Sequence, residues 1–122
     1  MVRKIRPPVL SGKTLKAKTQ CGSLFVTLNE MDGDLGEIRL NLGKSGSCAR
    51  AILELIGILY SIILQMDVPK DEKVKLFKKH CLGISCGNPF MIGEDKYTSC
   101  LDYIGKKCLE ELKDGPPSKD NI

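Results

Sequence analysis

The chain has 122 residues, of which 19 are basic and 15 acidic, giving a formal net charge of +4. This is the length of one small domain. Hydrophobic residues make up 42% of the chain, but tryptophan is absent, so we expect a largely aliphatic core. The mild and dispersed positive charge predicts weak attraction to anions and does not by itself predict nucleic-acid binding.

The amino-terminal segment, residues 1–12, is expected to be an extended arm, because its "RPP" sequence disfavours a helix. It is basic, but neither an apolar run nor a small-residue cleavage site follows, so we predict no signal peptide. The longest apolar run, residues 51–64, contains Glu54 and is shorter than a membrane span. We therefore expect a cytoplasmic protein that makes no membrane contact. Its six cysteines are then expected to be thiols or metal ligands and not disulfides.

Alternation of apolar and polar residues predicts strands over 13–19, 23–30 and 37–43, with an Asp-Gly hairpin turn inside 31–34. Together they form a three-stranded antiparallel sheet with one apolar and one polar face. The polar face carries side chains on which a ligand or partner could sit, although an exposed face is the default expectation; these are Lys16, Thr27 and Arg39.

Three helices are expected after the strands, over 48–65, 67–80 and 98–113, with Asp67 capping the second and Thr98 or Ser99 the third. Residues 82–97 are predicted to be a loop and 114–122 a disordered tail. Strands followed by helices indicate an α+β fold, with three helices packed on one face of the sheet in two layers and a single domain over 13–113.

The first helix is apolar around most of its circumference, which indicates burial on more than one side. The sheet can cover one side, so we predict a homodimer or larger assembly that covers another. The contact is expected in or near Ile52, Ile56, Leu59 or Ile63.

The turn before this helix, "GKSGS" at 43–47, places free backbone N–H groups beside a lysine. A helix start of this kind attracts anions, so phosphate or nucleotide binding is one hypothesis for this turn. Its residues are Lys44, Ser45, Gly46 and Ser47. The simpler interpretation is a strand-to-helix turn with Ser47 as the N-cap.

Four of the six cysteines lie at predicted junctions between elements, where backbone geometry can turn thiolates toward one point; they are Cys21, Cys48, Cys86 and Cys100. Tetrahedral thiolate sites typically hold Zn²⁺. The spacing contains no Cys-x-x-Cys pair, so spacing alone gives a weak signal, and an iron–sulfur cluster or no metal stays open. Cys81 and Cys108 are expected to be small buried hydrophobic residues.

No Ser-His-Asp or Cys-His arrangement is evident, and the single histidine, His80, lies at an expected helix end among lysines. A positive charge is favourable at that end of a helix. The sequence therefore predicts no catalytic residue.

Four stretches in this order, "KTQCGSLFVTLNE", "LGKSGSCARAILELIG", "LGISCGNP" and "TSCLD", resemble the Thr-Ser-Cys-Pro-Asp (TSCPD) domain. That domain occurs near the carboxyl terminus of adenosylcobalamin-dependent (class II) ribonucleotide reductases and as small stand-alone proteins. The resemblance covers about residues 6–112 and implies recurring cysteines at the four junction positions, which strengthens the zinc hypothesis. Leu101 stands where the family motif has proline, a residue that is favourable at a helix start but replaceable.

A chain of this length is expected to lack the barrel and cobalamin pocket of a reductase. The resemblance therefore implies a non-catalytic accessory module with a structural zinc site that binds a nucleotide, nucleic acid or a protein partner. The alternative is a metal-free protein that sequesters or senses nucleotides through the 43–47 turn. A thiol redox protein is disfavoured because no Cys-x-x-Cys motif is present.

Overall fold

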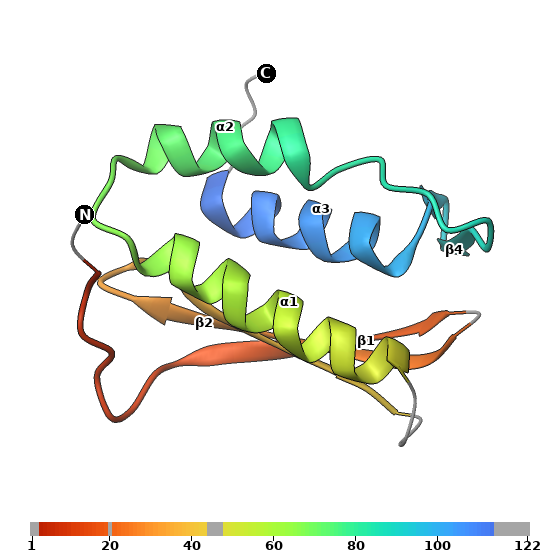
Figure 1. Cartoon of the computed structure of the whole chain (residues 1–122), viewed down its shortest axis with the longest axis horizontal. Coiled ribbons are helices and arrows are strands. Elements are labelled where there is room, and N and C mark those ends of the chain that lie inside the picture. The colour runs from red at the N-terminus through yellow and green to blue at the C-terminus, as the bar shows by residue number, and fades with distance from the viewer. Residues whose placement is uncertain (1–2, 20, 44–47, 114–122) are drawn as a thin grey trace.

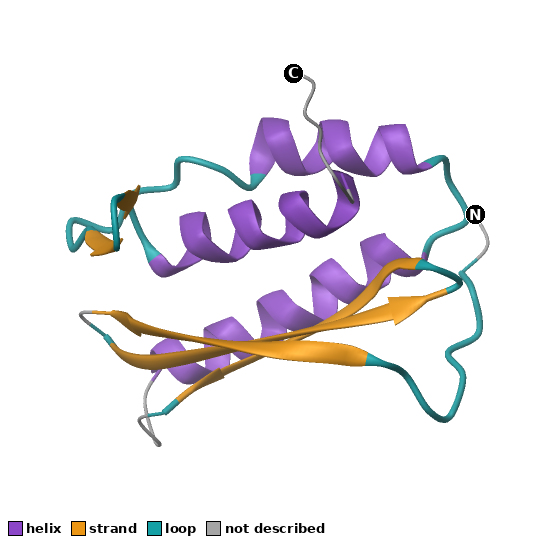
Figure 2. Cartoon of the chain, turned by 180° about the vertical axis from the view of Figure 1, so that it is seen from behind, coloured by secondary structure: helices purple, strands orange, loops and turns teal. Residues whose placement is uncertain are grey.

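The computed structural model describes residues 3–19, 21–43 and 48–113 and confirms the α+β fold. Three antiparallel strands come first and three helices follow on one side of the sheet (Figures 1 and 2). The elements are β1 (Gly12–Thr19), β2 (Gly22–Met31), β3 (Asp34–Leu42), α1 (Cys48–Gln65), α2 (Lys70–His80), β4 (Phe90–Ile92), β5 (Asp95–Tyr97) and α3 (Cys100–Lys113).

The sheet has the strand order β1-β2-β3. Its second hairpin turns at Asp32 and Gly33, whose φ angles of 55° and 84° are those of a primed turn that matches the twist of the strands. The register pairs Leu28 with Ile38 and Val26 with Leu40. The apolar side chains of β2 and β3 therefore share the face that the helices cover.

Helix α1 packs along β3, the strand at one edge of the sheet. Ser61 Oγ accepts a hydrogen bond from the Ile38 N–H at 3.0 Å and donates one to the Ile38 carbonyl at 3.0 Å. Gly57 brings the helix close, since a Cβ there would lie 3.4 Å from the Ile38 oxygen and 3.5 Å from the Leu40 nitrogen. The N–H and carbonyl of Ile38 thus form hydrogen bonds with α1 at the open edge of β3.

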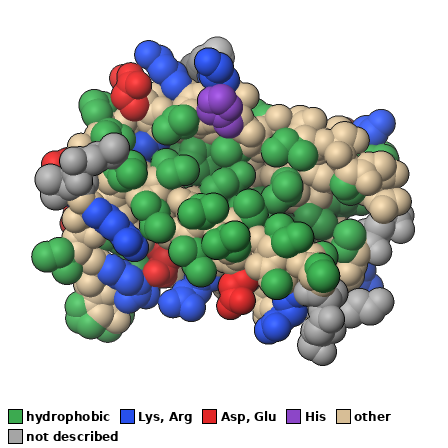
Figure 3. Space-filling model, viewed as in Figure 1, with side chains coloured by type: hydrophobic (Ala, Val, Ile, Leu, Met, Phe, Trp, Pro, Cys, Tyr) green, Lys and Arg blue, Asp and Glu red, His purple; other side chains and the backbone are tan. Residues whose placement is uncertain are grey.

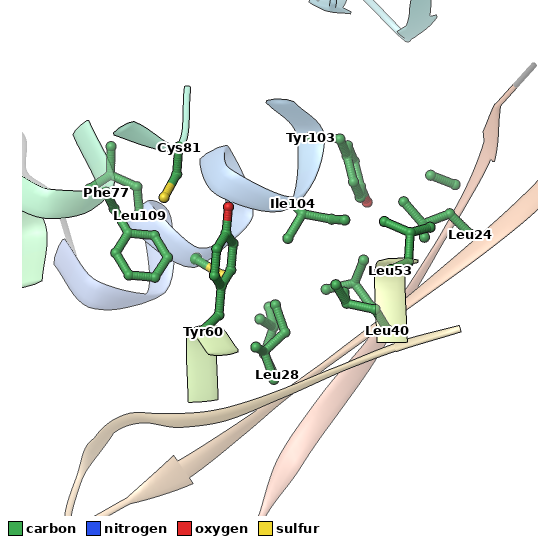
Figure 4. Packing of buried hydrophobic residues seen from close by; sticks show 14 of the residues in the cluster. Leu24, Leu28, Leu40, Leu53, Tyr60, Phe77, Cys81, Tyr103, Ile104 and Leu109 are labelled. Atoms are coloured by element: carbon green, nitrogen blue, oxygen red, sulfur yellow. The ribbon is translucent and has the colours of Figure 1, made fainter. Parts of the chain in front are cut away.

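The core lies between the sheet and the helices (Figure 4). It is less aliphatic than expected, because five of the six aromatic residues are buried in it. Tyr60 of α1 and Phe77 of α2 meet edge to face, with ring centroids 5.2 Å apart. The other three form one cluster at the start of α3; they are Phe90, Tyr97 and Tyr103. Cys81 and Cys108 are buried, as predicted.

Two local predictions were wrong. The segment 82–97 is not a loop throughout, because β4 and β5 form a hairpin in which Phe90 pairs with Tyr97. Helix α2 is not capped by Asp67: it begins at Lys70 after Pro69, and its cap makes no side-chain hydrogen bond. At α3, in contrast, Ser99 Oγ accepts a hydrogen bond from the Asp102 N–H at 3.0 Å, which confirms Ser99 as a capping residue.

Only one side of α1 is covered by the described part of the chain. Leu53, Tyr60 and Leu64 are buried, whereas a row of large apolar residues on the other side is 46–57% exposed: Ile52, Leu55, Ile58 and Leu59. Among the described residues, α1 is the helix long and apolar enough to cross a membrane by length and composition. The core helix of a soluble protein passes the same test, so this finding is weak evidence for a membrane.

Candidate functional site

Three of the four predicted cysteine ligands line one hollow of about 300 Å³, named here the cysteine hollow. They are Cys21, Cys86 and Cys100, which come from three segments far apart in the sequence. The remaining walls are almost entirely apolar and belong to the end of β3, the first turns of α1, the loop after α2 and the start of α3; they are Leu42, Ala49, Ile52, Leu53, Ile84, Ser85, Ser99 and Leu101.

Cys21 and Cys86 are both placed by hydrogen bonds of their backbone N–H groups. The Cys21 N–H donates to Thr19 Oγ1 at 3.0 Å, and the Thr19 hydroxyl donates to the Gly22 carbonyl at 2.9 Å, which closes the turn between β1 and β2. The Cys86 N–H donates to the Thr98 carbonyl at 3.3 Å. Gly87 follows with a φ of 83°, a conformation that glycine adopts without steric cost.

Asp102, a buried residue in the first turn of α3, holds two walls of the cysteine hollow together. Its carboxylate accepts hydrogen bonds from the Gly83 N–H at 2.8 Å and the Thr98 N–H at 3.0 Å, and pairs with Lys106 Nζ at 3.1 Å. Burial opposes the charged form, but these three partners outweigh it and lower the pKa of Asp102 below its ordinary value. Asp102 thereby fixes the loop that carries Cys86 against the helix that begins with Cys100.

In the sequence, Asp102 stands in the first turn of the helix expected over 98–113. Its spacing of three residues from Ser99 is typical of a helix cap. Its bond to Gly83 depends on a contact across 19 residues, which no local pattern indicates.

The Cys100 thiol is half-buried, and burial raises its pKa. The neighbouring Thr19 hydroxyl acts in the opposite direction, whereas the Cys21 and Cys86 thiols, which lie close enough to interact with it, raise the pKa further. The neutral thiol of Cys100 is thus favoured unless a positive charge lies beside it.

Cys48, the fourth predicted ligand, is exposed at the first residue of α1. Cys48 does not line the hollow. Its neighbours Ala49 and Ile52, in the first turns of the same helix, do line it. Within the ranges 3–19, 21–43 and 48–113, no three His, Cys, Asp or Glu side chains are already drawn together as a set that could hold a metal ion. Metal binding would require the thiols to turn toward a common point.

The donor set nevertheless fits zinc chemically. Thiolates are soft ligands that favour zinc in tetrahedral sites, and four cysteines satisfy such a site completely. The cysteine hollow joins three thiols to the turn of α1 that carries a fourth. Most of the remaining lining of the hollow is apolar, so few polar side chains there compete with the thiols for the metal.

The TSCPD domain model matches residues 1–113. The chain belongs to the TSCPD domain family. The "TSCLD" segment lies at the loop-to-helix junction before α3, where Thr98 and Ser99 precede the helix and Cys100 begins it. Leu101, which replaces the proline of the family motif, is the second residue of the helix and lines the cysteine hollow.

Two TSCPD relatives are vitamin B12-dependent ribonucleotide reductases. That of Agrobacterium fabrum (strain C58) is 33% identical over 97 residues, which cover 76% of this chain and 7% of the reductase. That of Bradyrhizobium diazoefficiens is 34% identical over 107 residues, which cover 84% of this chain and 8% of the reductase. The chain thus spans less than a tenth of the length of these relatives. No solved structure matches it.

The predicted anion-binding residues of the 43–47 turn are Lys44, Ser45, Gly46 and Ser47, and they lie outside the described residues. The predicted tail at 114–122 lies outside them as well. Of the turn, only Gly43 is described, and its N–H donates to the Ser23 carbonyl at 2.7 Å.

Proposed function

We propose that this TSCPD protein is a non-catalytic accessory module in which Cys21, Cys48, Cys86 and Cys100 hold one structural Zn²⁺ and which offers its remaining surface to a partner. The observation that carries the proposal is the meeting of three cysteines from three separate segments at one hollow. When bound, the metal supplies a cross-link between these segments and the start of α1.

A structural role is favoured over a catalytic one by the number of candidate ligands. Four thiolates close the coordination sphere of zinc, whereas catalytic zinc keeps a position for water or substrate. The matched region is also only 7–8% of the length of the reductases, so more than nine tenths of each reductase has no counterpart in this match. A reducing compartment such as the cytoplasm would keep the thiols available for metal.

The proposal is tested by measuring zinc per chain in protein purified under reducing conditions. We expect one zinc ion in the wild type and its loss in four single variants: Cys21→Ser, Cys48→Ser, Cys86→Ser and Cys100→Ser. Cys81→Ala is the matched control, because Cys81 is buried in the core away from the hollow, and it should keep the metal. Because thiols must lose protons to bind zinc, affinity should also fall as the pH is lowered.

A wild type that binds no zinc in metal-supplemented buffer would overturn the zinc site. Retention of zinc by Cys48→Ser alone would reduce the site to three protein ligands. That result would contradict the structural role, because three ligands leave a position open.

We further propose that the partner of α1 is a second copy of the chain. Hydrophobic side chains gather over α1 and the neighbouring helices on the face seen in Figure 3. The exposed residues Ile52, Leu55 and Leu59 are spaced by three and four positions, the spacing of a seam between two packed helices. Apolar patches beyond a few hundred Å² are rare on monomers, and two-fold pairing of this face would cover both copies at once.

Light scattering tests this pairing. We expect a dimer in the wild type and a monomer in Leu59→Lys, because a lysine ammonium is poorly accommodated in an apolar contact. Met91→Lys is the control, because Met91 is also exposed but lies on β4. A wild type that stays monomeric at high concentration, or that instead binds lipid vesicles through α1, would overturn the dimer.

A further inference from the structure

All four arginines of the chain lie in one region of the fold. Arg3, Arg6 and Arg39 line a hollow of about 320 Å³ between the amino-terminal segment, β3 and α1. Arg39 and Arg50 line a second hollow of about 330 Å³ beside it. The two share Arg39, Leu40 and Glu54, so they form one continuous feature, named here the arginine groove.

The one aromatic residue outside the buried core also lies in the arginine groove. Phe25 is half-buried on β2 and lines the second hollow, while the five other aromatic residues are buried. The sheet register places Phe25 opposite Asn41 and places Thr27 opposite Arg39. All four side chains therefore project from the sheet face that the helices leave open.

Part of the positive charge in the groove is neutralised internally. Glu37 accepts hydrogen bonds from Arg6 Nε at 2.7 Å, from Arg6 Nη2 at 3.2 Å and from Asn29 Nδ2 at 2.8 Å. Arg3 Nε donates a hydrogen bond to Gln65 Oε1 at 2.8 Å. This acceptor is an uncharged amide, so the bond does not neutralise the charge of Arg3. These contacts hold the amino-terminal segment as one wall of the groove.

The guanidinium at the centre of the groove is loosely held. The Arg39 side chain is 70% exposed, and its Nε lies 3.7 Å from Glu37 Oε1, whose main partner is Arg6. Across the second hollow, Arg50 Nε donates a hydrogen bond to Asn41 Oδ1 at 3.4 Å. Arg39 and Arg50 thus both line this hollow, together with the carboxylate of Glu54.

We propose that the arginine groove binds a nucleotide, with Arg39 and Arg50 on the phosphoryl groups and the Phe25 ring under the base. Arginine is the side chain best suited to phosphate, because its planar fork donates two parallel hydrogen bonds. Every base presents a ring face that stacks on an aromatic side chain. This inference rests on the proposed role as an accessory binding module, and it names a ligand and a binding site for that role. It does not depend on the cysteine site.

The dimensions and polarity of the groove match a small phosphorylated ligand. Each hollow is near the lower end of the roughly 300–1,000 Å³ range of small-molecule sites. Asn41 and Glu54 add an amide and a carboxylate that can pair with the hydroxyl and amino groups of a nucleoside. A long anionic polymer would need a basic track with several aromatic platforms, and the groove has a single such ring.

Isothermal titration calorimetry with ADP tests the proposal. We expect ADP binding that Arg39→Gln and Arg50→Gln each weaken by about 10- to 100-fold, because a hydrogen bond between charged groups is lost. Phe25→Leu should weaken ADP roughly tenfold and leave pyrophosphate binding unchanged. Lys75→Gln is the matched control, because Lys75 is also an exposed cation 3.7 Å from one acid, and it should bind ADP as the wild type does.

Absence of ADP binding by a folded wild type would overturn the proposal, and so would equal affinities of the wild type and both arginine variants. Equal effects of Phe25→Leu on ADP and pyrophosphate would remove the base platform. Tighter binding of a single-stranded oligonucleotide than of ADP would replace the nucleotide with nucleic acid. Zinc content measured in the same samples separates the two proposals, since the arginine variants should keep it and the Cys100→Ser variant should keep ADP binding.

Discussion

The cysteine hollow and the arginine groove lie on different sides of the same helix and have opposite chemistry. Ala49, Ile52 and Leu53 of α1 line the first, and Arg50 and Glu54 line the second. Successive residues of a helix point about 100° apart. Residues 49–54 therefore contribute side chains to both sites. A single helix can therefore separate an apolar, thiol-lined site from a polar, guanidinium-lined one.

The two sites also differ in what holds them. A buried carboxylate, Asp102, joins the walls of the cysteine hollow, and its partners are two backbone N–H groups and one lysine. The arginine groove is held by the Ser61 hydroxyl against β3 and by the Glu37 carboxylate against Arg6. Removing each of these groups should affect one site and spare the other.

The largest effect is expected for Asp102→Asn. We expect the free energy of unfolding to fall by about 3 kcal/mol, because the Gly83 and Thr98 N–H groups lose a buried, charged acceptor and Lys106 loses its partner. Urea denaturation of the zinc-free protein measures the change. Asp71→Asn is the control, because Asp71 is exposed in the first turn of α2 and its loss should cost less than about 1 kcal/mol. Equal losses in the two variants would contradict the role given to Asp102.

A smaller loss is expected for Ser61→Ala, about 2 kcal/mol, because the N–H and carbonyl of Ile38 lose their shared partner in a buried place. The same urea experiment measures it, with Ser11→Ala as the exposed counterpart. Zinc content should not change, since Ser61 lies on the side of α1 that faces the arginine groove. A fall in zinc content would show that the two sides of α1 are not independent.

The smallest effect, about 1 kcal/mol at neutral pH, is expected for Glu37→Gln. The hydrogen bonds from Arg6 lower the pKa of Glu37 below 4.5, burial opposes this, and Asn29 and Arg39 add to the lowering. A lowered pKa in the folded state means that the carboxylate stabilises the fold above about pH 4.5 and loses this effect as the pH falls through the folded pKa. The stability difference between wild type and variant should therefore shrink between neutral pH and about pH 3. A difference that stays constant with pH would exclude the ion pair as its source.

Alternation and apolar periodicity were sufficient to predict the sheet and helix α1, whose predicted bounds of 48–65 match the structure. The same patterns did not predict the β4–β5 hairpin. Its strands have three residues each, which is too short for alternation to be recognised. The patterns also misplaced the start of α2, because Pro69 directly precedes its first residue and takes the cap position without a side-chain bond.

The two sites were unequally visible in the sequence. Each of the four candidate cysteines stands in a recognisable stretch at a junction, so the four could be grouped from their positions along the chain, and all four stay predicted ligands. The arginines stand at positions 3, 6, 39 and 50, in no shared motif. The polar sheet face pointed to Arg39 and Thr27, but the packing of α1 along β3 decides that Arg50 lies beside them, and this packing is a long-range property.

The hydroxyl of Ser61 against Ile38 has a consequence for how the protein behaves at high concentration. An open strand edge is a template for fibril growth, and folded proteins block such edges. Here the β3 edge is blocked by a helix, while β1 at the opposite edge carries the exposed lysines Lys16 and Lys18, whose charge disfavours stacking of like strands. We therefore expect crowding to drive copies together through their helices, into bounded assemblies, and not through their sheets into filaments.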